Sequence, residues 1–236
     1  MCSCTILHIY PVTQRKIMLR RFLTTKITRT RLRDFLAHHA TSERVLDVGS
    51  SANTLADLFP NTFRGDIRHI PEVDVQYDAH SLPILSESVA TILCTEVLEH
   101  CHTPQQVIHE FYRVLQPNGK LILTTRFVFP LHDTPHDYFR FTRYGLQHLC
   151  KQFAVIEIIE ETGTVETVAV LLQRLIYQVN WKLPGMKVIL GLLARLIMPL
   201  QHTITHEYGE IDKKTSEKAI LSSGYYLIAT KANIED

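Results

Sequence analysis

RVLDVGSSAN, residues 44–53, is the stretch that decides how this 236-residue sequence folds. A short apolar run ends in Asp47, turns at Gly49 and leads into LADLF, which can start a helix. Nineteen residues after Asp47 comes a second acid, Asp66, at about the distance needed to end the next strand. This is the layout of a nucleotide-binding βαβ unit, whose ligand sits beyond the carboxyl ends of the strands. Because the second acid can accept hydrogen bonds from two ribose hydroxyls, the pattern predicts an adenosine-containing ligand.

The glycine content of this turn narrows the choice of ligand. A dinucleotide fingerprint reads G-x-G-x-x-G, whereas Gly49 is followed by Ser50, Ser51, Ala52 and Asn53. Only Gly49 readily takes a positive φ angle, and Asn53 is the next candidate. The loop is therefore poorly suited to a pyrophosphate, which favours a ligand without a phosphate over a dinucleotide. An ordinary tight turn between strand and helix is the structural alternative.

Further elements follow at regular intervals. Val73–Pro83 predicts a third strand that ends at Asp78, and Ser88–His100 predicts a fourth that ends near Cys94. Gln105–Thr125 predicts an amphipathic helix, a Pro-Asn-Gly turn and a fifth strand, because its apolar residues recur at helical spacing. The order of strands and helices indicates an α/β protein.

At this point the chain resembles a known family. LDVGS, Asp66, YDAHSLP, CTEVLEH and FYRVLQPNGKLILTT, in this order, resemble the class I S-adenosylmethionine-dependent methyltransferases, and most closely the subgroup called methyltransferase type 11. The resemblance covers residues 44–153 continuously and extends to the last strand. It implies a Rossmann-like, seven-stranded mixed sheet in the order 3-2-1-4-5-7-6, with the last strand antiparallel and helices on both faces. It also implies S-adenosyl-L-methionine as the cofactor.

The same resemblance implies a role for each cofactor-binding position. Asp47 would sit near the methionine part of the cofactor, and Gly49 with Ser50 would let the backbone pass close to it. The main-chain carbonyl of Cys94 would accept from the methionine ammonium group. On the adenosine side, Asp66 would hold the ribose hydroxyls. Asp78 and Ala79 would face the adenine ring.

Candidates for a catalytic base lie after the fifth strand, in FPLHDTPHDYFRFT, residues 129–142. A segment that follows a strand's carboxyl end stands at the mouth of the cofactor site in such a fold. We expect His132 or His136 to act as the base for an oxygen acceptor, with Asp137 orienting it. Arg140 would bind an anionic acceptor group or anchor the loop.

A purely structural interpretation of this segment stays open. Thr142 would cap a helix that starts near Arg143, and Arg140 would pair with Asp137. His100 is a further candidate base or a packing residue. Although H-D-x-x-H-D offers metal ligands, no spacing matches H-E-x-x-H or paired C-x-x-C sites, so we predict no metal.

Composition and length fit a single intracellular domain. Apolar residues make up 45% of the chain, and the net charge of +1 gives no electrostatic reason to expect nucleic acid. The odd number of cysteines, five, suggests no disulfide framework and favours the cytoplasm. Positive charge is concentrated before the first strand, where it forms a solvated helix face or meets an anionic membrane or acceptor. The residues are Arg15, Lys16, Arg20, Arg21, Lys26, Arg29, Arg31 and Arg33.

The predicted organisation is a leader over residues 1–25 and one domain over 26–236, beginning with a helix at Thr28–His39. Phe153–Glu160 and Gly224–Thr230 predict the sixth and seventh strands. Between them lies a helical insertion, residues 165–210, whose two apolar helical patterns break at Leu183-Pro184-Gly185. It forms a lid over the acceptor site, a homodimer contact, or a membrane-surface element beside a lipid-linked acceptor.

Two functions from different classes follow. The first is methyl transfer, most simply to an oxygen of a sugar, a lipid or another small-molecule acceptor. The second is a non-catalytic, methyltransferase-like binding protein with an altered cofactor loop. The gathering of histidines and aspartates in residues 132–137 favours the first, because a scaffold without catalysis does not need bases at its cleft. A dehydrogenase ranks third because the loop suits a pyrophosphate poorly.

Overall fold

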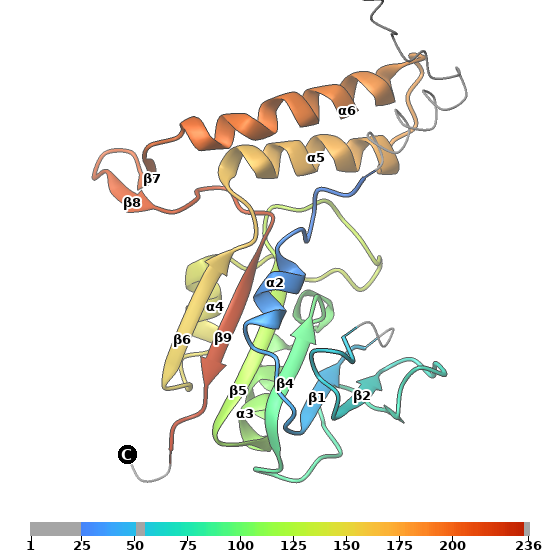
Figure 1. Ribbon diagram of the computed structural model, residues 1–236, viewed down its shortest axis with the longest axis vertical. Helices are drawn as coiled ribbons and strands as arrows, with labels where there is room; N and C mark the ends of the chain where they lie inside the picture. The colour runs from blue at the N-terminus through green and yellow to red at the C-terminus, as the bar shows by residue number, and fades with distance from the viewer. Residues whose placement is uncertain (1–24, 51–54, 234–236) are drawn as a thin grey trace, which may run out of the picture.

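The computed structural model describes residues 25–50 and 55–233, and a seven-stranded sheet forms its centre (Figure 1). The strands lie in the order β3-β2-β1-β4-β5-β9-β6, and β9 runs antiparallel to both of its neighbours. The predicted order and the antiparallel last strand are therefore confirmed, with β9 as the seventh strand of this sheet. The strands are β1 (Val45–Val48), β2 (Thr62–Asp66), β3 (Val75–Gln76), β4 (Val89–Thr95), β5 (Leu115–Arg126), β6 (Val155–Glu160) and β9 (Gly224–Thr230).

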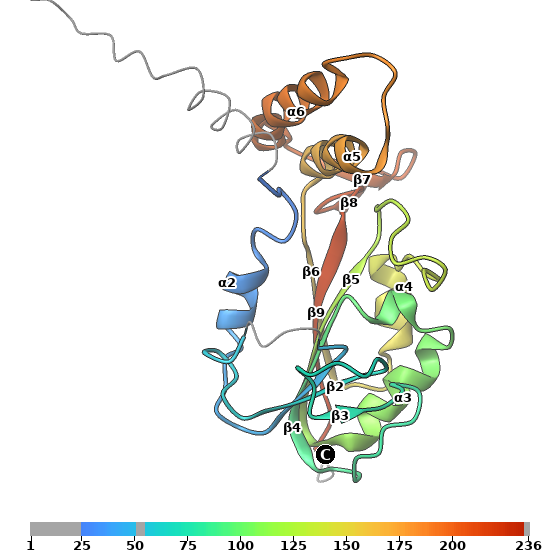
Figure 2. The same cartoon turned by 90° about the vertical axis from the view of Figure 1, so that its right-hand side faces the viewer.

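Helices cover both faces of the sheet, as predicted (Figure 2). On one face lie α3 (Pro104–Val114) and α4 (Arg143–Leu149), whose buried Phe111 and Leu146 join the larger core cluster. On the other face lies α2 (Leu32–Ala37), which buries Phe35 and Leu36 against the sheet. Because both faces are covered, β4 and β9 are almost continuously apolar rather than alternating.

Two predicted helices differ from the structure, each for a local reason. The helix expected over Thr28–His39 is reduced to six residues, since Arg29 has a φ of +59° and cannot continue a helix toward the N-terminus. The helix expected to start in LADLF is a single turn within the described residues, closed by the Phe59 N–H to the Leu55 carbonyl at 2.9 Å. Pro60 follows at once and disfavours helical geometry at Phe59.

The strands around the Pro-Asn-Gly turn and at the sheet edge also differ in detail. Residues 117–119 form a bulge inside β5, with Asn118 at a φ of +63°, instead of a separate turn. The third strand is only two residues long, and Asp78 follows its end rather than closing it.

A helical hairpin occupies the predicted insertion and lies across the end of the sheet toward which β4 and β5 point (Figure 1). It consists of α5 (Thr164–Gln178) and α6 (Met186–Ile197), followed by the 3-10 helix η2 (Met198–Thr203). The break falls where predicted, at Gly185, whose φ is +81°. A small antiparallel pair that the sequence did not predict, β7 (Glu207–Glu210) and β8 (Thr215–Glu217), then leads back to β9.

Some sequence predictions fall outside the described residues. These include the leader up to residue 24, with four of its basic side chains, and the turn residues Ser51, Ala52 and Asn53. Across residues 25–50 and 55–233, no helix has both the length and the apolar character that crossing a bilayer requires.

Candidate functional site

Two adjoining cavities open at the carboxyl ends of β1, β2 and β4. The first, of about 540 Å³, is lined by Asp47 and Ser50, and the second, of about 470 Å³, is lined by Asp66, Asp78 and Ala79. The two cavities share four lining residues: Gly49, Arg68, Glu96 and Asp133. The acids predicted at consecutive strand tips therefore face one continuous cleft, as parallel strands require.

The backbone after β1 is held in a shape that only glycine tolerates well. Gly49 has a φ of +74°, and a Cβ built on it would lie 2.3 Å from Cγ2 of Val97. The N–H groups of Gly49 and Ser50 both donate to the Gly65 carbonyl, at 2.8 and 3.2 Å. These bonds fix the turn against β2 and keep its backbone close to the floor of both cavities.

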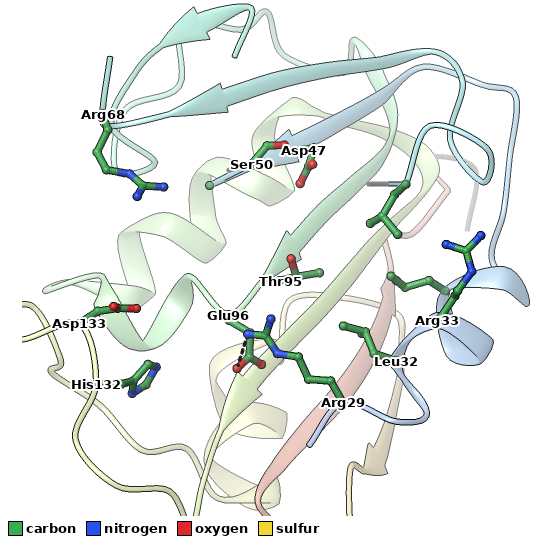
Figure 3. Close-up of a pocket in the computed structure, with 13 residues that line it drawn as sticks. Arg29, Leu32, Arg33, Asp47, Ser50, Arg68, Thr95, Glu96, His132 and Asp133 are labelled. Carbon is green, nitrogen blue, oxygen red and sulfur yellow. Dashed lines mark ion pairs between the residues drawn. The ribbon is translucent and has the colours of Figure 1, made fainter. Parts of the chain in front are cut away.

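Asp47 stands beside Ser50 on one wall of the first cavity (Figure 3). Burial raises the pKa of this carboxyl from its usual 3.8 to about 6, and the neighbouring Ser50 hydroxyl and the charge of Arg64 oppose the rise. A carboxylate held in such a place favours a cationic group nearby.

Asp66 ends β2, as predicted, and its side chain is 4% exposed. Arg68 binds it through two side-chain hydrogen bonds of 2.9 and 2.8 Å, and the Arg68 N–H donates to it at 2.8 Å. Burial opposes ionisation of Asp66, but these bonds outweigh it and leave its pKa below the usual value. The carboxylate is thus charged, and the 62% exposed Arg68 side chain is the part of this pair that can move.

Asp78 is held by a histidine that the sequence did not single out. Its carboxylate accepts from the backbone N–H of His80 at 2.9 Å and lies 2.6 Å from His80 Nδ1. His80 Nε2 accepts from the Thr103 N–H at 3.2 Å, so the ring is neutral with its proton on Nδ1. His102 stacks on His80 with 4.1 Å between ring centroids. This chain of contacts fixes the direction of Asp78 in the second cavity.

The fourth strand ends at Thr95, next to its predicted end near Cys94, but Cys94 itself does not line the cleft. Cys94 is fully buried inside the strand, paired with Val48 and Leu123, and lines neither cavity. Thr95 and Glu96 occupy the tip instead, because the strand runs one residue further.

Glu96 is the centre of a charge network that the sequence analysis missed. It has a φ of +58° and pairs with Arg29 at 3.1 Å (Figure 3). It also pairs with Arg126, which is itself bound to Glu161 at 2.6 Å. Thr124 donates to Glu96 at 3.0 Å. The only sequence signal was an acid directly after a buried strand, in CTEVLEH.

The histidine-rich segment after β5 stands at the cleft, as predicted. His132 lines the first cavity, and His136 lines the second. Asp137 binds Arg140 through two hydrogen bonds of 2.6 Å, which lower the pKa of Asp137 to about 2. It also accepts from the His132 N–H at 3.0 Å, while His132 Nδ1 lies 3.6 Å away.

Asp137 therefore holds the backbone at His132 while bound to Arg140, and its role in orienting the His132 ring stays a prediction. The structural alternative is also present, because Thr142 caps α4 by accepting from the Gly145 N–H at 3.0 Å. Burial lowers the pKa of His132, with the nearby charges adding smaller effects of both signs. The ring is thus neutral at neutral pH and able to accept a proton.

Part of this chain is similar in sequence to known methyltransferases. Residues 36–123 match the family described as a methyltransferase domain. A protein of Mycolicibacterium smegmatis described as a probable S-adenosylmethionine-dependent methyltransferase is 30% identical over 117 residues, which are 42% of this chain and 46% of that protein. The chain thus spans less than half the length of this curated relative.

Solved structures agree on the fold. A methyltransferase from Archaeoglobus fulgidus superposes with a TM-score of 0.56 and 12% identity, over 92% of this chain and 99% of that one. The [4+2]-cyclase SpnF superposes with a TM-score of 0.55 and 16% identity, over 86% and 80%. Residues 36–123 thus resemble a methyltransferase domain, and the chain shares the fold of these two solved structures.

Within this fold, nine of the ten predicted site positions reach or anchor the same cleft. Eight line a cavity, Asp137 fixes the loop that carries His132, and Cys94 stays inside its strand. His100, the further candidate base, lines the second cavity, and its Nδ1 lies 2.8 Å from the His136 carbonyl. Its neighbour Glu99 is fully buried, accepts from the Thr125 hydroxyl at 2.7 Å, and has a pKa that burial raises to about 8.

Proposed function

We propose that this domain binds S-adenosylmethionine and transfers its methyl group to an oxygen of a small-molecule acceptor. The observation that carries the proposal is the shared cleft at the strand tips, lined by Asp47, Asp66 and Asp78, with His132 at its mouth. Methyl transfer to oxygen needs a positioned cofactor and a group that can take the acceptor's proton, and this cleft offers both.

The residues present fit the cofactor. Gly49 lines both cavities, and its lack of a Cβ lets the turn pack against Val97 with its backbone at the cleft. Asp66 would hold the ribose hydroxyls, and Asp78 with Ala79 would face the adenine. Asp47 and the β4 tip would hold the methionine part, whose ammonium is a cation. When bound, S-adenosylmethionine supplies a methyl group on a positively charged sulfur, which is an excellent leaving group.

In this proposal, His132 is the general base that takes the proton from the acceptor's hydroxyl group. Its ring is neutral because it is largely buried, and Asp137 fixes the backbone that carries it. A placed base of this kind is worth about 10²–10⁴-fold in rate. Because Asp137 is already bound to Arg140, it acts as a positioning residue for His132 rather than as a base.

In this proposal, the α5–α6 hairpin is a lid that determines which acceptor can enter the site. Gln178, at the end of α5, donates to the Leu131 carbonyl at 2.8 Å, and the Arg174 guanidinium lies 4.6 Å from the centre of the Phe129 ring. The hairpin thus contacts the segment that carries His132. A sugar or a lipid-linked acceptor remains our proposal for the molecule that enters between them.

The outward side of α6 supports the two other interpretations of the hairpin, contact with a membrane surface or with a second copy. Ile189, Leu192, Leu193 and Leu196 are all more than 40% exposed. From residue 167 to residue 206 the chain has no acidic residue, which suits an anionic lipid surface better than a random protein surface. A cytoplasmic location with peripheral membrane contact is proposed on this basis.

Cofactor binding is tested by calorimetric titration with S-adenosylmethionine and, in parallel, with NAD. We expect binding of the first only, and Asp66→Ala should weaken it by about 10-fold, the scale of one or two charge-assisted hydrogen bonds. The matched control is Asp212→Ala, which removes an exposed acid in the β7–β8 turn that lines neither cavity. Equal affinity in the two variants would remove Asp66 from the site, and tighter binding of NAD would overturn the cofactor assignment.

His132→Ala tests the catalytic assignment. We expect turnover to fall about 100-fold, the lower end for general-base catalysis, with the affinity for S-adenosylmethionine changed less than threefold. The assay follows radiolabelled methyl transfer to a panel of nucleotide sugars and hydroxylated lipids. His109→Ala, an exposed histidine on α3, serves as the control. Cofactor binding without turnover on any acceptor of the panel would favour the non-catalytic binding protein instead.

A further inference from the structure

Three potential ligand side chains converge beside the two cavities. One oxygen or nitrogen atom from each of Glu99, His100 and His132 lies within 4.8 Å of the others. His132 reaches this point from the first cavity and His100 from the second. We propose that these three residues bind one divalent transition-metal ion, a site that goes beyond the proposed methyl transfer.

The buried carboxylate of Glu99 distinguishes this cluster from a chance grouping of polar side chains. Its side chain is fully buried, at 0% exposure, and one carboxylate oxygen, Oε2, accepts from the Thr125 hydroxyl at 2.7 Å. The other, Oε1, is buried and has no hydrogen-bond partner among the described residues. It lies 3.9 Å from His132 Nε2. A buried carboxylate oxygen without a partner is costly, and a bound cation removes that cost.

One of the two imidazole rings, that of His100, is oriented by a hydrogen bond as metal ligands usually are. His100 Nδ1 donates to the His136 carbonyl at 2.8 Å, which leaves its Nε2 with a lone pair. His132 Nδ1 lies 3.6 Å from Asp137 Oδ2, too far for a hydrogen bond, and its Nε2 faces Glu99. A carbonyl or carboxylate behind the ring fixes its orientation and raises its basicity as a ligand.

The donor set indicates the class of ion. Two imidazoles and one carboxylate suit Zn²⁺, Mn²⁺, Co²⁺ or Fe²⁺ better than Ca²⁺ or Mg²⁺, which prefer oxygen ligands. Three protein ligands leave coordination positions open toward the cavities. Resting on the proposed function, we assign those positions to the acceptor's hydroxyl oxygen, whose proton such an ion makes easier to remove. When the ion is bound, His132 is a ligand rather than the base, and the acceptor's proton passes to solvent.

The sequence did not reveal this set because its members are far apart in the chain. Glu99 and His100 follow β4 in the 3-10 turn η1 (Leu98–His100), whereas His132 lies in the loop after β5. The neighbouring pair β4 and β5 brings them together through its parallel register. The segment H-D-x-x-H-D, which the sequence analysis considered for metal binding, contributes only its first histidine.

The test is calorimetric titration of the chelator-treated 236-residue chain with Zn²⁺, without S-adenosylmethionine. Cys2 and Cys4 are replaced by serine in every sample, so that terminal thiols do not compete for the ion. We expect the reference protein to bind about one equivalent. Glu99→Gln, which keeps the hydrogen bond to Thr125, and His132→Asn should each weaken binding at least 30-fold. His109→Asn, an exposed histidine on α3, should leave binding unchanged.

Absence of stoichiometric binding, or equal affinity in all four proteins, would overturn the proposal. Circular dichroism checks that each variant is folded, and if Glu99→Gln is not, His132→Asn decides because its side chain lies at the cavity wall rather than in the core. A complementary readout is the nuclear magnetic resonance of the imidazole protons: Zn²⁺ should shift the signals of His100 and His132 but not that of His109. Since neither measurement uses cofactor or acceptor, their outcome is independent of whether the protein transfers methyl groups.

Discussion

Replacing Gly49 with alanine should weaken S-adenosylmethionine binding several-hundred-fold and lower the stability of the folded protein. The added Cβ would lie 2.3 Å from Val97 Cγ2, and Gly49 has a φ of +74°, which alanine disfavours. Steric overlap in a packed region costs about 1–3 kcal/mol, and the left-handed backbone adds about 1–2 kcal/mol. The turn must shift to relieve the overlap, and that shift moves the floor of both cavities. Calorimetry for the cofactor and thermal unfolding for stability measure the two effects.

Gly185 provides a matched control for the cost of placing alanine in a left-handed backbone conformation. Its φ is +81°, almost the same as that of Gly49, but a Cβ there meets nothing within 4 Å. Gly185→Ala should therefore cost only the conformational strain and leave cofactor affinity intact. Combining Gly49→Ala with Val97→Ala should restore part of the affinity, because it removes the overlapping methyl group. If Gly49→Ala binds the cofactor as tightly as the wild type, the backbone at this turn is not part of the binding site.

The parts of the site that could be predicted from the sequence are those set by local geometry. Asp47 and Gly49 follow a short apolar strand, and a strand tip followed by a turn places them at a cleft whatever the rest of the chain does. The sheet order was predictable through the resemblance to a known family, and the apolar runs of β4 and β9 through their burial on both faces.

What could not be predicted depends on contacts between distant segments. Arg29, 67 residues before its partner Glu96, is brought there by the way α2 packs on the sheet. The short α2 and the single turn ending at Phe59 show local backbone preferences overriding an apolar pattern that suits a helix.

Replacing Asp47 with asparagine should make the protein without cofactor more stable at pH 7 while weakening its hold on S-adenosylmethionine. Burial raises the pKa of Asp47 from 3.8 to about 6, so the folded state binds its proton more tightly than the unfolded state does. Stability therefore falls as the pH rises from about 4 to about 6, by up to about 3 kcal/mol, and stays low above that range. Asparagine cannot ionise and avoids this loss. Urea unfolding at pH 4 and pH 7 should show a gain at pH 7 that disappears at pH 4.

Asp66→Asn is the control, and we expect it to change the stability at pH 7 in the opposite direction. Hydrogen bonds from Arg68 outweigh burial and hold the pKa of Asp66 below its usual value, so its charged form stabilises the fold above the unfolded pKa. That variant should lose stability at pH 7. Both variants should bind S-adenosylmethionine more weakly, since each removes a negative charge from a cleft proposed to hold a cationic ligand. An Asp47→Asn protein that is less stable at pH 7 yet binds the cofactor normally would show that the buried carboxylate serves the fold, not the ligand.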